Sequence, residues 1–310
     1  MNGGAIDWHA GASHGNVSYC SFENNVANRS AGAIYWSGHN GTITHSNFTL
    51  NRALGIALGP MPNGTMTYGG DAGAVMWTGA LGIVDECIFV NNSATQRGGA
   101  IFLQAGLTAN GTVQNCENTT FKNSLFADNV AGLNGGAIEW LRGARNGVVD
   151  NVTFINNTAR RSGGAIFWHG INGTVKNSKF NNNRATGETL QYDMDLKMEN
   201  VVIVNGSALP ANLEQGKLYV LNYTKDGVRV FESYVVGEND ELIKLDETTT
   251  ISQTISPQDW AIDQFFGGDG GTILWSGDIG TVNNCTFDNS NSARRGGGAY
   301  MHGSSNVTFS

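Results

Sequence analysis

The amino-acid sequence predicts an all-β fold: a right-handed parallel β-helix, or solenoid, of about eight coils with a small β module inserted into it. Two observations support this prediction. A pair of sequence anchors recurs eight times in the same order, and copies that no insertion separates lie 26 to 28 residues apart. The chain also has 43 glycines among 310 residues and no apolar stripe with helical spacing, which argues against a solenoid of paired helices.

The first anchor reads G-G-A-I-x-W, as in residues 163–168, and the second reads F-x-x-N-x-A, as in residues 180–185. The alanine position of the first anchor falls at Ala5, Ala33, Ala74, Ala100, Ala137, Ala165, Thr272 and Ala299. The phenylalanine of the second anchor falls at Phe22, Phe48, Phe89, Phe126, Phe154, Phe180, Phe287 and Phe309. This constant order is typical of stacked, nearly identical structural units.

Each copy contains the short alternation of strands. Ile166 and Trp168 are two residues apart and therefore share one face of a strand. Val175 and Ser178 are three residues apart, which breaks the alternation and predicts a bend, and Phe180 resumes it. One coil should therefore contain a strand, a turn, a strand, a bend, a strand and a turn. Each strand should pair with its copies in the adjacent coils, about 4.8 Å away.

Stacked copies would place like residues in columns that form structural ladders. One column holds tryptophans, with Leu103 in a single coil: Trp8, Trp36, Trp77, Trp140, Trp168 and Trp275. A second holds the phenylalanines Phe22, Phe48, Phe89, Phe126, Phe154, Phe180 and Phe287. A third holds asparagines at a turn: Asn25, Asn51, Asn92, Asn129, Asn157 and Asn183. Asparagine tolerates turn conformations, and stacked amides can hydrogen-bond along a column.

The paired motifs resemble those of two families. G-G-A-I followed by F-x-x-N is similar to the repeats of chlamydial polymorphic outer-membrane proteins. The fuller form, G-G-A-I-x-W followed by N-G-T-V-x-N-C-T-F-x-N-N-x-A, resembles the adhesin-like surface proteins of methanogenic archaea. The resemblance covers the chain except for its insertions. It implies a right-handed β-helix in a secreted, adhesive cell-surface protein, and it supplies no catalytic residues.

Insertions divide the chain. We expect β-helix coils over residues 1–185, with loop insertions at 51–70 and 106–120, an inserted β-rich module over 186–266, and further coils over 267–310. The module is more charged than the coils and lacks both anchors. Insertions in a solenoid often carry binding, and the alternative is a module that only covers the coil.

Within the module, three apolar runs are expected to form strands: residues 201–206, 217–236 and 241–252. Lys225, Asp226 and Gly227 interrupt the second run with the residues of a hairpin turn.

The composition limits the kinds of partner that the chain is expected to bind. The formal net charge is −8, and no basic patch is interleaved with aromatic residues, so nucleic acid is not an expected partner. No run approaches the length of a membrane span, and no cofactor is expected. Because the chain begins and stops within a repeat and natural solenoids end in caps, we expect a monomeric fragment of a larger extracellular protein.

The four cysteines are expected to be unpaired. Cys20, Cys87 and Cys285 occupy one inward column on non-adjacent coils. Strands that lie two coils apart are separated by roughly 10 Å, whereas a disulfide needs Cα atoms within about 7 Å. These three residues should therefore be buried thiols. Cys116 lies in an insertion and is either buried or reactive.

N-x-S/T sequons recur along the chain and predict a glycosylated surface protein. The sites singled out are Asn40, Asn63, Asn110, Asn172 and Asn222. The alternative is that repeats copy one another and that Asn-Gly-Thr suits turns.

Asp71 and Asp269 mark the points where the chain returns to the coils after an insertion. Carboxylates at such turns can bind Ca²⁺, but no repeated D-x-D pattern accompanies them. Stabilisation of the turn is favoured, and no metal site is expected.

The position between isoleucine and tryptophan in the first anchor is the candidate ligand-binding stripe. If isoleucine and tryptophan point inward, this column points outward. Its apolar members are Tyr35, Met76, Phe102 and Phe167. The opposite phase would bury Asp7 and Glu139, which is costly for unpaired carboxylates. An exposed apolar stripe indicates a surface for a sugar or a partner, unless an insertion covers it.

No arrangement of acids indicates catalysis. Parallel β-helices include polysaccharide lyases and glycosidases, which need acids clustered on one outward face. Asp7 and Glu139 lie four coils apart, roughly 19 Å at the strand spacing. We therefore expect a non-catalytic adhesin-like protein that contacts a surface glycan or a surface protein of another cell. The alternatives are a carbohydrate-active enzyme and a purely structural stalk.

Overall fold

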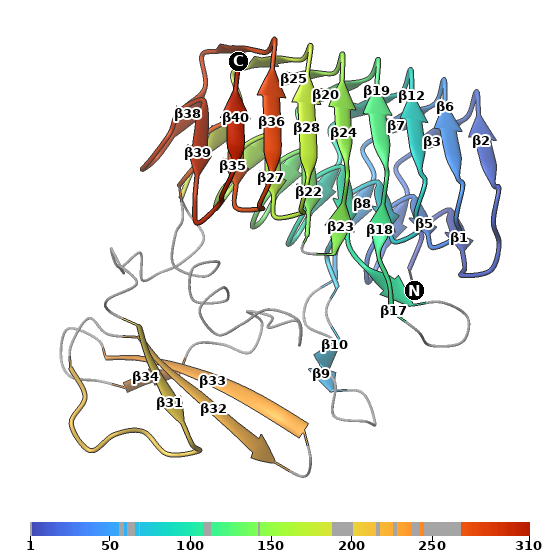
Figure 1. The fold of residues 1–310 in the computed structure, drawn as a ribbon. Coiled ribbons are helices and arrows are strands. Elements are labelled where there is room, and N and C mark those ends of the chain that lie inside the picture. Colours follow the sequence, from blue (N-terminus) through green and yellow to red (C-terminus); the bar gives the residue numbers. More distant parts are fainter. Residues whose placement is uncertain are drawn as a thin grey trace. The chain divides into compact units, whose positions relative to one another are not determined.

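The chain forms the expected parallel β-helix, whose stacked coils are shown in Figure 1. The computed structural model describes residues 2–55, 59–60, 66–67, 69–107, 113–141, 143–187, 201–214, 218–225, 228–236, 242–244 and 268–310. The right-handed sense of the winding stays a prediction.

Four parallel sheets, named A to D here in the order in which a coil passes through them, form the walls of the solenoid. Sheet A contains β1 (Ile6–Trp8), β5 (Ile34–Trp36), β11 (Val75–Trp77), β15 (Ile101–Leu103), β22 (Ile138–Trp140), β27 (Ile166–Trp168), β35 (Ile273–Trp275) and β39 (Ala299–Met301). Sheet B contains β2 (Asn16–Ser18), β6 (Thr42–Thr44), β12 (Ile83–Asp85), β19 (Thr120–Lys122), β24 (Val148–Asp150), β28 (Gly173–Lys176), β36 (Gly280–Asn283) and β40 (Val307–Phe309).

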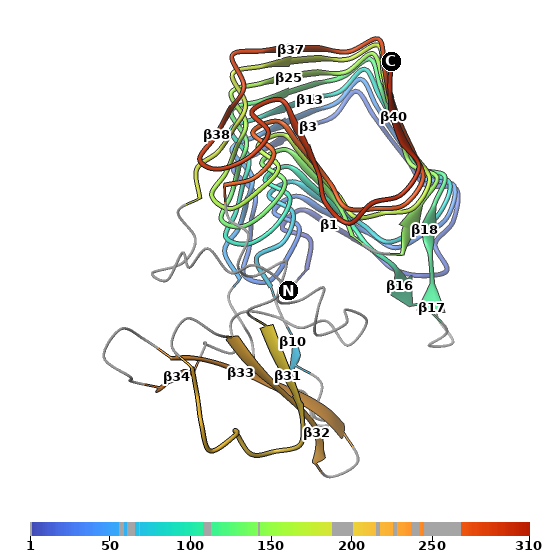
Figure 2. The same cartoon turned by 60° about the vertical axis from the view of Figure 1, so that its left-hand side comes forward.

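The other two walls have one strand fewer. Sheet C contains β3 (Ser21–Glu23), β7 (Asn47–Thr49), β13 (Ile88–Val90), β20 (Leu125–Ala127), β25 (Thr153–Ile155), β29 (Lys179–Asn181) and β37 (Thr286–Asp288). Sheet D contains β4 (Val26–Ala27), β8 (Arg52–Ala53), β14 (Ser93–Ala94), β21 (Val130–Ala131), β26 (Thr158–Ala159), β30 (Arg184–Ala185) and β38 (Asn291–Ser292). Coils are numbered here by their strand in sheet A, and Figure 2 shows strands of sheet C following one another along the stack. The prediction of three strands per coil missed the two-residue strands of sheet D.

The core consists of the predicted ladders. Ile166 pairs with Ile273, and Trp168 with Trp275, in adjacent strands. Stacked tryptophan rings lie 4.2 to 4.9 Å apart between centroids, and stacked phenylalanine rings lie 4.6 to 5.2 Å apart. The aromatic spacing therefore follows the spacing of the strands, so each ring packs on its copies without shifting the register.

The asparagine ladder is also present, and its central members are fully buried. Asn129 shows the pattern: its Nδ2 donates to Asn157 Oδ1 at 2.9 Å and to the Phe89 carbonyl at 3.0 Å. The backbone N–H of Asn129 donates to the same Asn157 oxygen at 3.1 Å. Each buried amide thus satisfies polar groups of both neighbouring coils, as burial requires.

The first residue before or in each strand of sheet B is usually glycine, because the tryptophan ring of the same coil packs directly against its backbone. A Cβ on Gly173 would lie only 2.1 Å from the Trp168 ring, and one on Gly82 would lie 2.6 Å from Trp77. The Asn-Gly-Thr motif therefore serves core packing as well as turn geometry.

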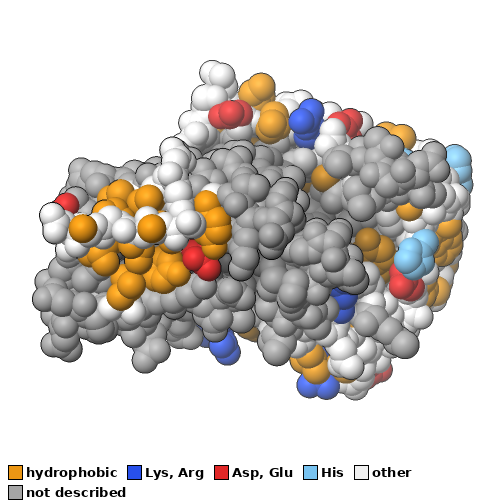
Figure 3. Space-filling view, turned by 90° about the horizontal axis from the view of Figure 1, so that it is seen from below, with side chains coloured by type: hydrophobic (Ala, Val, Ile, Leu, Met, Phe, Trp, Pro, Cys, Tyr) orange, Lys and Arg blue, Asp and Glu red, His pale blue; other side chains and the backbone are white. Residues whose placement is uncertain are grey.

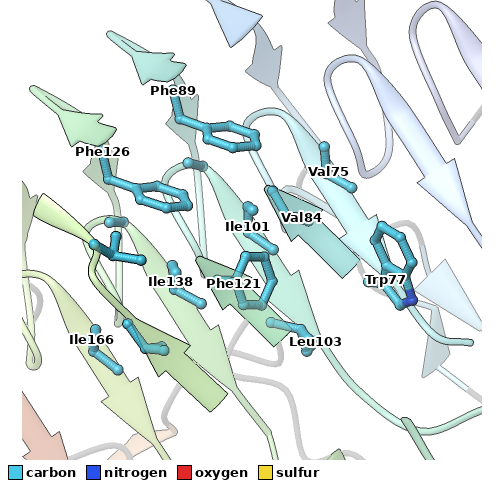
Figure 4. Close-up of a cluster of buried hydrophobic side chains, with 14 of the residues drawn as sticks. Val75, Trp77, Val84, Phe89, Ile101, Leu103, Phe121, Phe126, Ile138 and Ile166 are labelled. Atoms are coloured by element: carbon cyan, nitrogen blue, oxygen red, sulfur yellow. The ribbon is translucent and has the colours of Figure 1, made fainter. Parts of the chain in front are cut away.

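The fourth coil departs from this pattern at three coupled positions. Leu103 replaces tryptophan, Thr119 occupies the place of Gly82, and Phe121 occupies the place of Val84. Figure 4 shows the Phe121 ring beside Leu103, and the ring also packs edge-on against Trp140 at 5.1 Å. With no indole present, a larger residue fits at 119, and the phenylalanine fills volume that the tryptophan occupies elsewhere.

In the last coil the first anchor lies one residue earlier in the chain than the sequence analysis predicts. Ala299 pairs with Ile273 and Tyr300 pairs with Leu274, so Ala299 lies in the isoleucine column and Tyr300 lies in the stripe. The three glycines 296–298 caused the misalignment, because the motif matches in either of two registers. Phe309 was also misassigned: it pairs with Val282 in sheet B, not with Phe287.

The excursions from the coils contain short pairings of their own. β9 (Gly59–Pro60) and β10 (Met66–Thr67) are antiparallel, as are β16 (Gly106–Leu107) and β17 (Val113–Gln114). β18 (Cys116–Glu117) instead pairs in parallel with β23 (Ala144–Arg145) of the next coil.

Contacts divide the chain into two compact units: residues 1–56, 69–189 and 267–310 form the coil unit, and residues 57–68 with 190–266 form the other. The second unit holds a sheet of β31 (Val201–Asn205), β32 (Leu218–Lys225), β33 (Val228–Val236) and β34 (Leu242–Lys244). β32 and β33 are antiparallel, with Lys225 opposite Val228, which is the pairing expected for the predicted hairpin. Its turn residues, Asp226 and Gly227, lie outside the described residues.

Candidate functional site

The candidate stripe of sheet A is not an open surface: of the two alternatives that the sequence left open, an exposed stripe and a covered one, the structure has the covered one. Met76 is 6% exposed, Phe102 0% and Phe167 5%, and only Tyr35 is half-buried. These residues lie outside the core cluster that contains Ile101 and its column. Their side chains are therefore on the outward side of the sheet, as predicted, yet they are covered.

One covering group comes from the turn before sheet A. The Arg97 guanidinium lies over the Phe102 ring, 4.6 Å from its centroid, in a cation–π arrangement. Glu139, in the same column, is also fully buried, although its phase was expected to expose it. Alternation along a strand predicts which side of the sheet a residue faces, but it does not predict which other residues cover that side.

The two aspartates that follow insertions have arginine partners. The Asp269 carboxylate accepts from Arg294 Nε at 3.1 Å and from Arg294 Nη2 at 2.7 Å. Asp71 is paired in the same way with Arg97, and both carboxylates are buried. The sequence analysis placed the aspartates in turns but missed both arginines, which stand one coil further along.

An outward column of sheet B carries alternating charge over four consecutive coils. Lys122 Nζ lies 3.1 Å from Asp85 Oδ2, and Lys176 Nζ lies 3.2 Å from Asp150 Oδ2. Burial acts to raise the pKa of Asp150, but hydrogen bonds from Asn177 and Lys176 and the nearby lysine charges outweigh it, so the pKa falls below its ordinary value. In both pairs the lysine and the aspartate lie directly opposite each other in adjacent strands.

At the three corners that follow sheets A, B and C, a residue other than glycine has positive φ in each of the first seven coils, and asparagine is the commonest choice. At the corner between sheets B and C these residues are Tyr19, His45, Glu86, Asn123, Asn151, Asn177 and Asn284, with φ from 48° to 54°. The asparagines link coils: Asn151 Nδ2 donates to Asn123 Oδ1 at 2.8 Å, and Asn284 Nδ2 donates to Asn177 Oδ1 at 2.9 Å. The sequence-based prediction covered the inward ladders and the outward stripe of sheet A, and it missed these exposed corner columns.

The first three coils replace the corner asparagine with a different set of side chains. The Tyr19 and His45 rings stack with centroids 4.6 Å apart and planes inclined by 22°. His45 Nε2 lies 2.5 Å from Glu86 Oε2. Tyr19 is 79% exposed, and His45 and Glu86 are exposed as well. This corner is an exposed aromatic and polar cluster, and the name corner cluster is used below for Tyr19, His45 and Glu86.

All four cysteines are free, but they differ in burial. Cys87 and Cys116 are buried, Cys285 is half-buried and Cys20 is exposed. The expectation that the whole column is buried was wrong for Cys20, which lies in the first coil and has a neighbouring coil on one side only. Burial raises the pKa of Cys87 to about 11 and that of Cys116 to about 12.

The predicted glycosylation sites lie in different surroundings. Asn40 and Asn172 are exposed and have positive φ at the corner between sheets A and B. Asn222 lies in β32, while Asn63 and Asn110 fall outside the described residues.

Other kinds of site find little support in the part of the chain that the structure describes. No group of three or more His, Cys, Asp or Glu residues there is placed to hold a metal ion. The described residues also include no apolar helix of membrane-spanning length. On the face seen in Figure 3, basic and acidic side chains are scattered among others over the described surface.

Comparison with known families finds a match to a repeat family. A model of the Chlamydia polymorphic membrane protein (Chlamydia_PMP) repeat matches residues 86–104 and 151–167. Each segment runs from a corner between sheets B and C, through a core phenylalanine, to the next strand of sheet A. Comparison with curated proteins and with solved structures gave no match. The predicted resemblance to the chlamydial repeats is thus supported over two coil segments.

Proposed function

We propose that this chain is a non-catalytic, adhesin-like part of a secreted cell-surface protein that contacts a glycan or a protein on another cell. The observation that carries the proposal is the contrast between the two sides of each wall. The inward tryptophan, phenylalanine and asparagine columns repeat one residue type from coil to coil. The outward column of sheet B and the first three positions of the corner between sheets B and C change from coil to coil.

This contrast suits display on a rigid shaft. Coils pair through the backbone in all four sheets and stack rings in two columns, so an outward side chain is held at a fixed height on the stack. The variable outward positions include the alternating charges of sheet B and the corner cluster. The match to a repeat of surface proteins supports the same proposal.

Adhesion can be tested with beads that carry the purified chain at defined density. The beads would be presented to a panel of bacterial, archaeal and animal cells, and bound beads would be counted against albumin-coated beads. We expect saturable binding to at least one cell type that soluble protein competes away. Binding no greater than that of albumin throughout the panel would reject the proposal and favour a structural stalk.

A second measurement addresses the enzymatic alternative. The chain would be incubated with acidic and neutral polysaccharides, and new reducing ends would be measured. Release of reducing ends above a heat-inactivated control would contradict the non-catalytic assignment, whether or not the beads adhere.

A further inference from the structure

At the position of the corner cluster, coils four to seven carry asparagine, which suits the conformation of this corner. In coils four to seven the same corner position holds asparagine, whose amide bonds to the adjacent coil. In the first three coils it holds Tyr19, His45 and Glu86, with φ of 54°, 48° and 51°. The backbone conformation is thus the same in all seven coils, and only the side chains differ.

Stability alone does not favour these three residues. Left-handed backbone is uncommon for residues other than glycine and asparagine, and a bulky side chain there is an outlier. Such strained residues cluster at functional sites. Exposed Leu50, Leu81 and Ile279 hold the same left-handed conformation at other corners, so strain alone does not mark a site. What distinguishes the three positions is the Tyr19–His45 ring stack and the His45–Glu86 ion pair in place of asparagine.

The exposed chemistry of the cluster is that of a sugar-binding surface. Tyr19 presents an aromatic ring with negative π density and a hydroxyl on the same side chain. Glu86, and Asp85 beside it, are carboxylates that accept hydrogen bonds, and His45 supplies ring nitrogens. A pyranose presents weakly positive C–H groups on its faces and hydroxyl donors around its rim, which match these two kinds of group.

We propose that Tyr19, His45 and Glu86 form a binding site for a neutral carbohydrate, with Tyr19 stacking on a sugar ring and Glu86 accepting from its hydroxyls. The proposal deepens the adhesive function proposed above and depends on it. Charge favours a neutral sugar over an anionic one, because Asp85 and Glu86 are adjacent and Lys122 is already paired with Asp85. The three residues lie on consecutive coils, so the site runs along the stack.

The test replaces the cluster with the residue that the protein itself uses at this corner. The variant Tyr19→Asn/His45→Asn/Glu86→Asn should keep the fold, because asparagine suits positive φ and extends the amide column. The matched control is Leu50→Asn: Leu50 is an exposed residue with φ of 57° at the corner between sheets C and D. Thermal unfolding of each variant would show that the coils are intact.

Binding would be measured on the full chain by calorimetric titration with cellohexaose, chitohexaose and mannohexaose, and on a printed array of neutral oligosaccharides. We expect at least one of these glycans to bind, the triple variant to bind it at least about tenfold more weakly, and Leu50→Asn to bind it as the wild type does. The triple variant should unfold at a temperature equal to or above that of the wild type.

Two results would overturn the inference. One is that no glycan binds the folded wild-type chain; the other is that a glycan binds with the same affinity to the triple variant. The bead assay distinguishes failure of this binding site from failure of the proposed adhesive function. If wild-type and triple-variant beads adhere equally, adhesion stands and this site is rejected; if neither adheres, the adhesive function fails first.

Discussion

The Asp71 carboxylate and the Arg97 guanidinium form a bidentate ion pair between consecutive coils, with Nε 2.9 Å from Oδ1 and Nη2 2.9 Å from Oδ2. Both side chains are buried. The position that corresponds to Asp71 holds Ser30, Asn134 and Ser162 in three other coils, and Arg97 itself holds it in the fourth. The second such pair, Asp269 with Arg294, also stands where the chain returns from an excursion. These pairs fix the turn at which an insertion rejoins the stack.

Breaking this pair should be costly. Asp71→Asn removes the carboxylate that neutralises a buried guanidinium, and loss of one partner of a buried pair costs about 3–5 kcal/mol. Urea unfolding would measure the change in the free energy of unfolding. The control is Asp85→Asn, at an ion pair whose lysine is 42% exposed, which should change stability by at most about 1 kcal/mol. Equal losses in the two variants would contradict the assigned role of Asp71.

Because Leu103, Thr119 and Phe121 pack as a unit in the fourth coil, changes in the free energy of unfolding caused by mutating them should be strongly non-additive. Leu103→Trp alone should overpack the core against Phe121 and Thr119 and cost about 1–3 kcal/mol. Phe121→Val alone should leave a cavity and cost about 2–4 kcal/mol. The triple variant Leu103→Trp/Thr119→Gly/Phe121→Val recreates the pattern of the other coils, so its loss should be smaller than either single loss. Additive losses in denaturant unfolding would show that these positions are independent.

The buried asparagine ladder should matter more than the exposed one. Asn129→Ala removes an amide that satisfies polar groups of both adjacent coils, and each buried group left without a partner costs about 1–3 kcal/mol. Asn156→Ala removes an exposed amide that donates to Asp128 Oδ1 at 3.0 Å and accepts from Asn182 Nδ2 at 2.8 Å, and both bonds are open to water. We expect a marked fall in melting temperature for the first variant and a much smaller one for the second. A larger fall for Asn156→Ala would reverse the proposed roles.

The thiols should differ in reactivity at pH 8. Thiolate is the reactive form, and the pKa of Cys87 is raised to about 11 and that of Cys116 to about 12, chiefly by burial. A disulfide reagent should therefore modify exposed Cys20 first and reach Cys87 and Cys116 only after unfolding. Mass spectrometry of partly modified protein would identify the order. Early modification of Cys116 would contradict its burial.

The same pKa values predict how stability changes at high pH. Below the ordinary thiol pKa of 9.0, Cys87 is protonated in both states and does not alter stability with pH. Above it the unfolded chain ionises first, so stability falls as pH rises from 9.0 toward about 11. Cys87→Ser/Cys116→Ser should show a shallower fall over this range, measured as melting temperature against pH.

Much of the fold could be predicted from the sequence because the coil repeats. A position that must face a stacked copy of itself keeps its residue type, so the tryptophan, phenylalanine and asparagine ladders are visible as periodic letters. The same reasoning found the bend between Val175 and Ser178, which separates β28 from β29. It failed by one residue at Ala299, where three successive glycines make two registers equivalent, and it missed the strands of sheet D, which are only two residues long.

Tertiary structure decided what periodicity does not encode. Phe102 and Tyr19 are both outward aromatic residues, yet the first is fully buried and the second is 79% exposed. Alternation within a strand specifies only the side on which a residue lies, whereas its exposure depends on groups contributed by other coils and turns, such as Arg97 over Phe102. The partners of Asp71 and Asp269 and the corner cluster likewise emerge only once 25 or more residues of chain have wound back to bring one coil against the next.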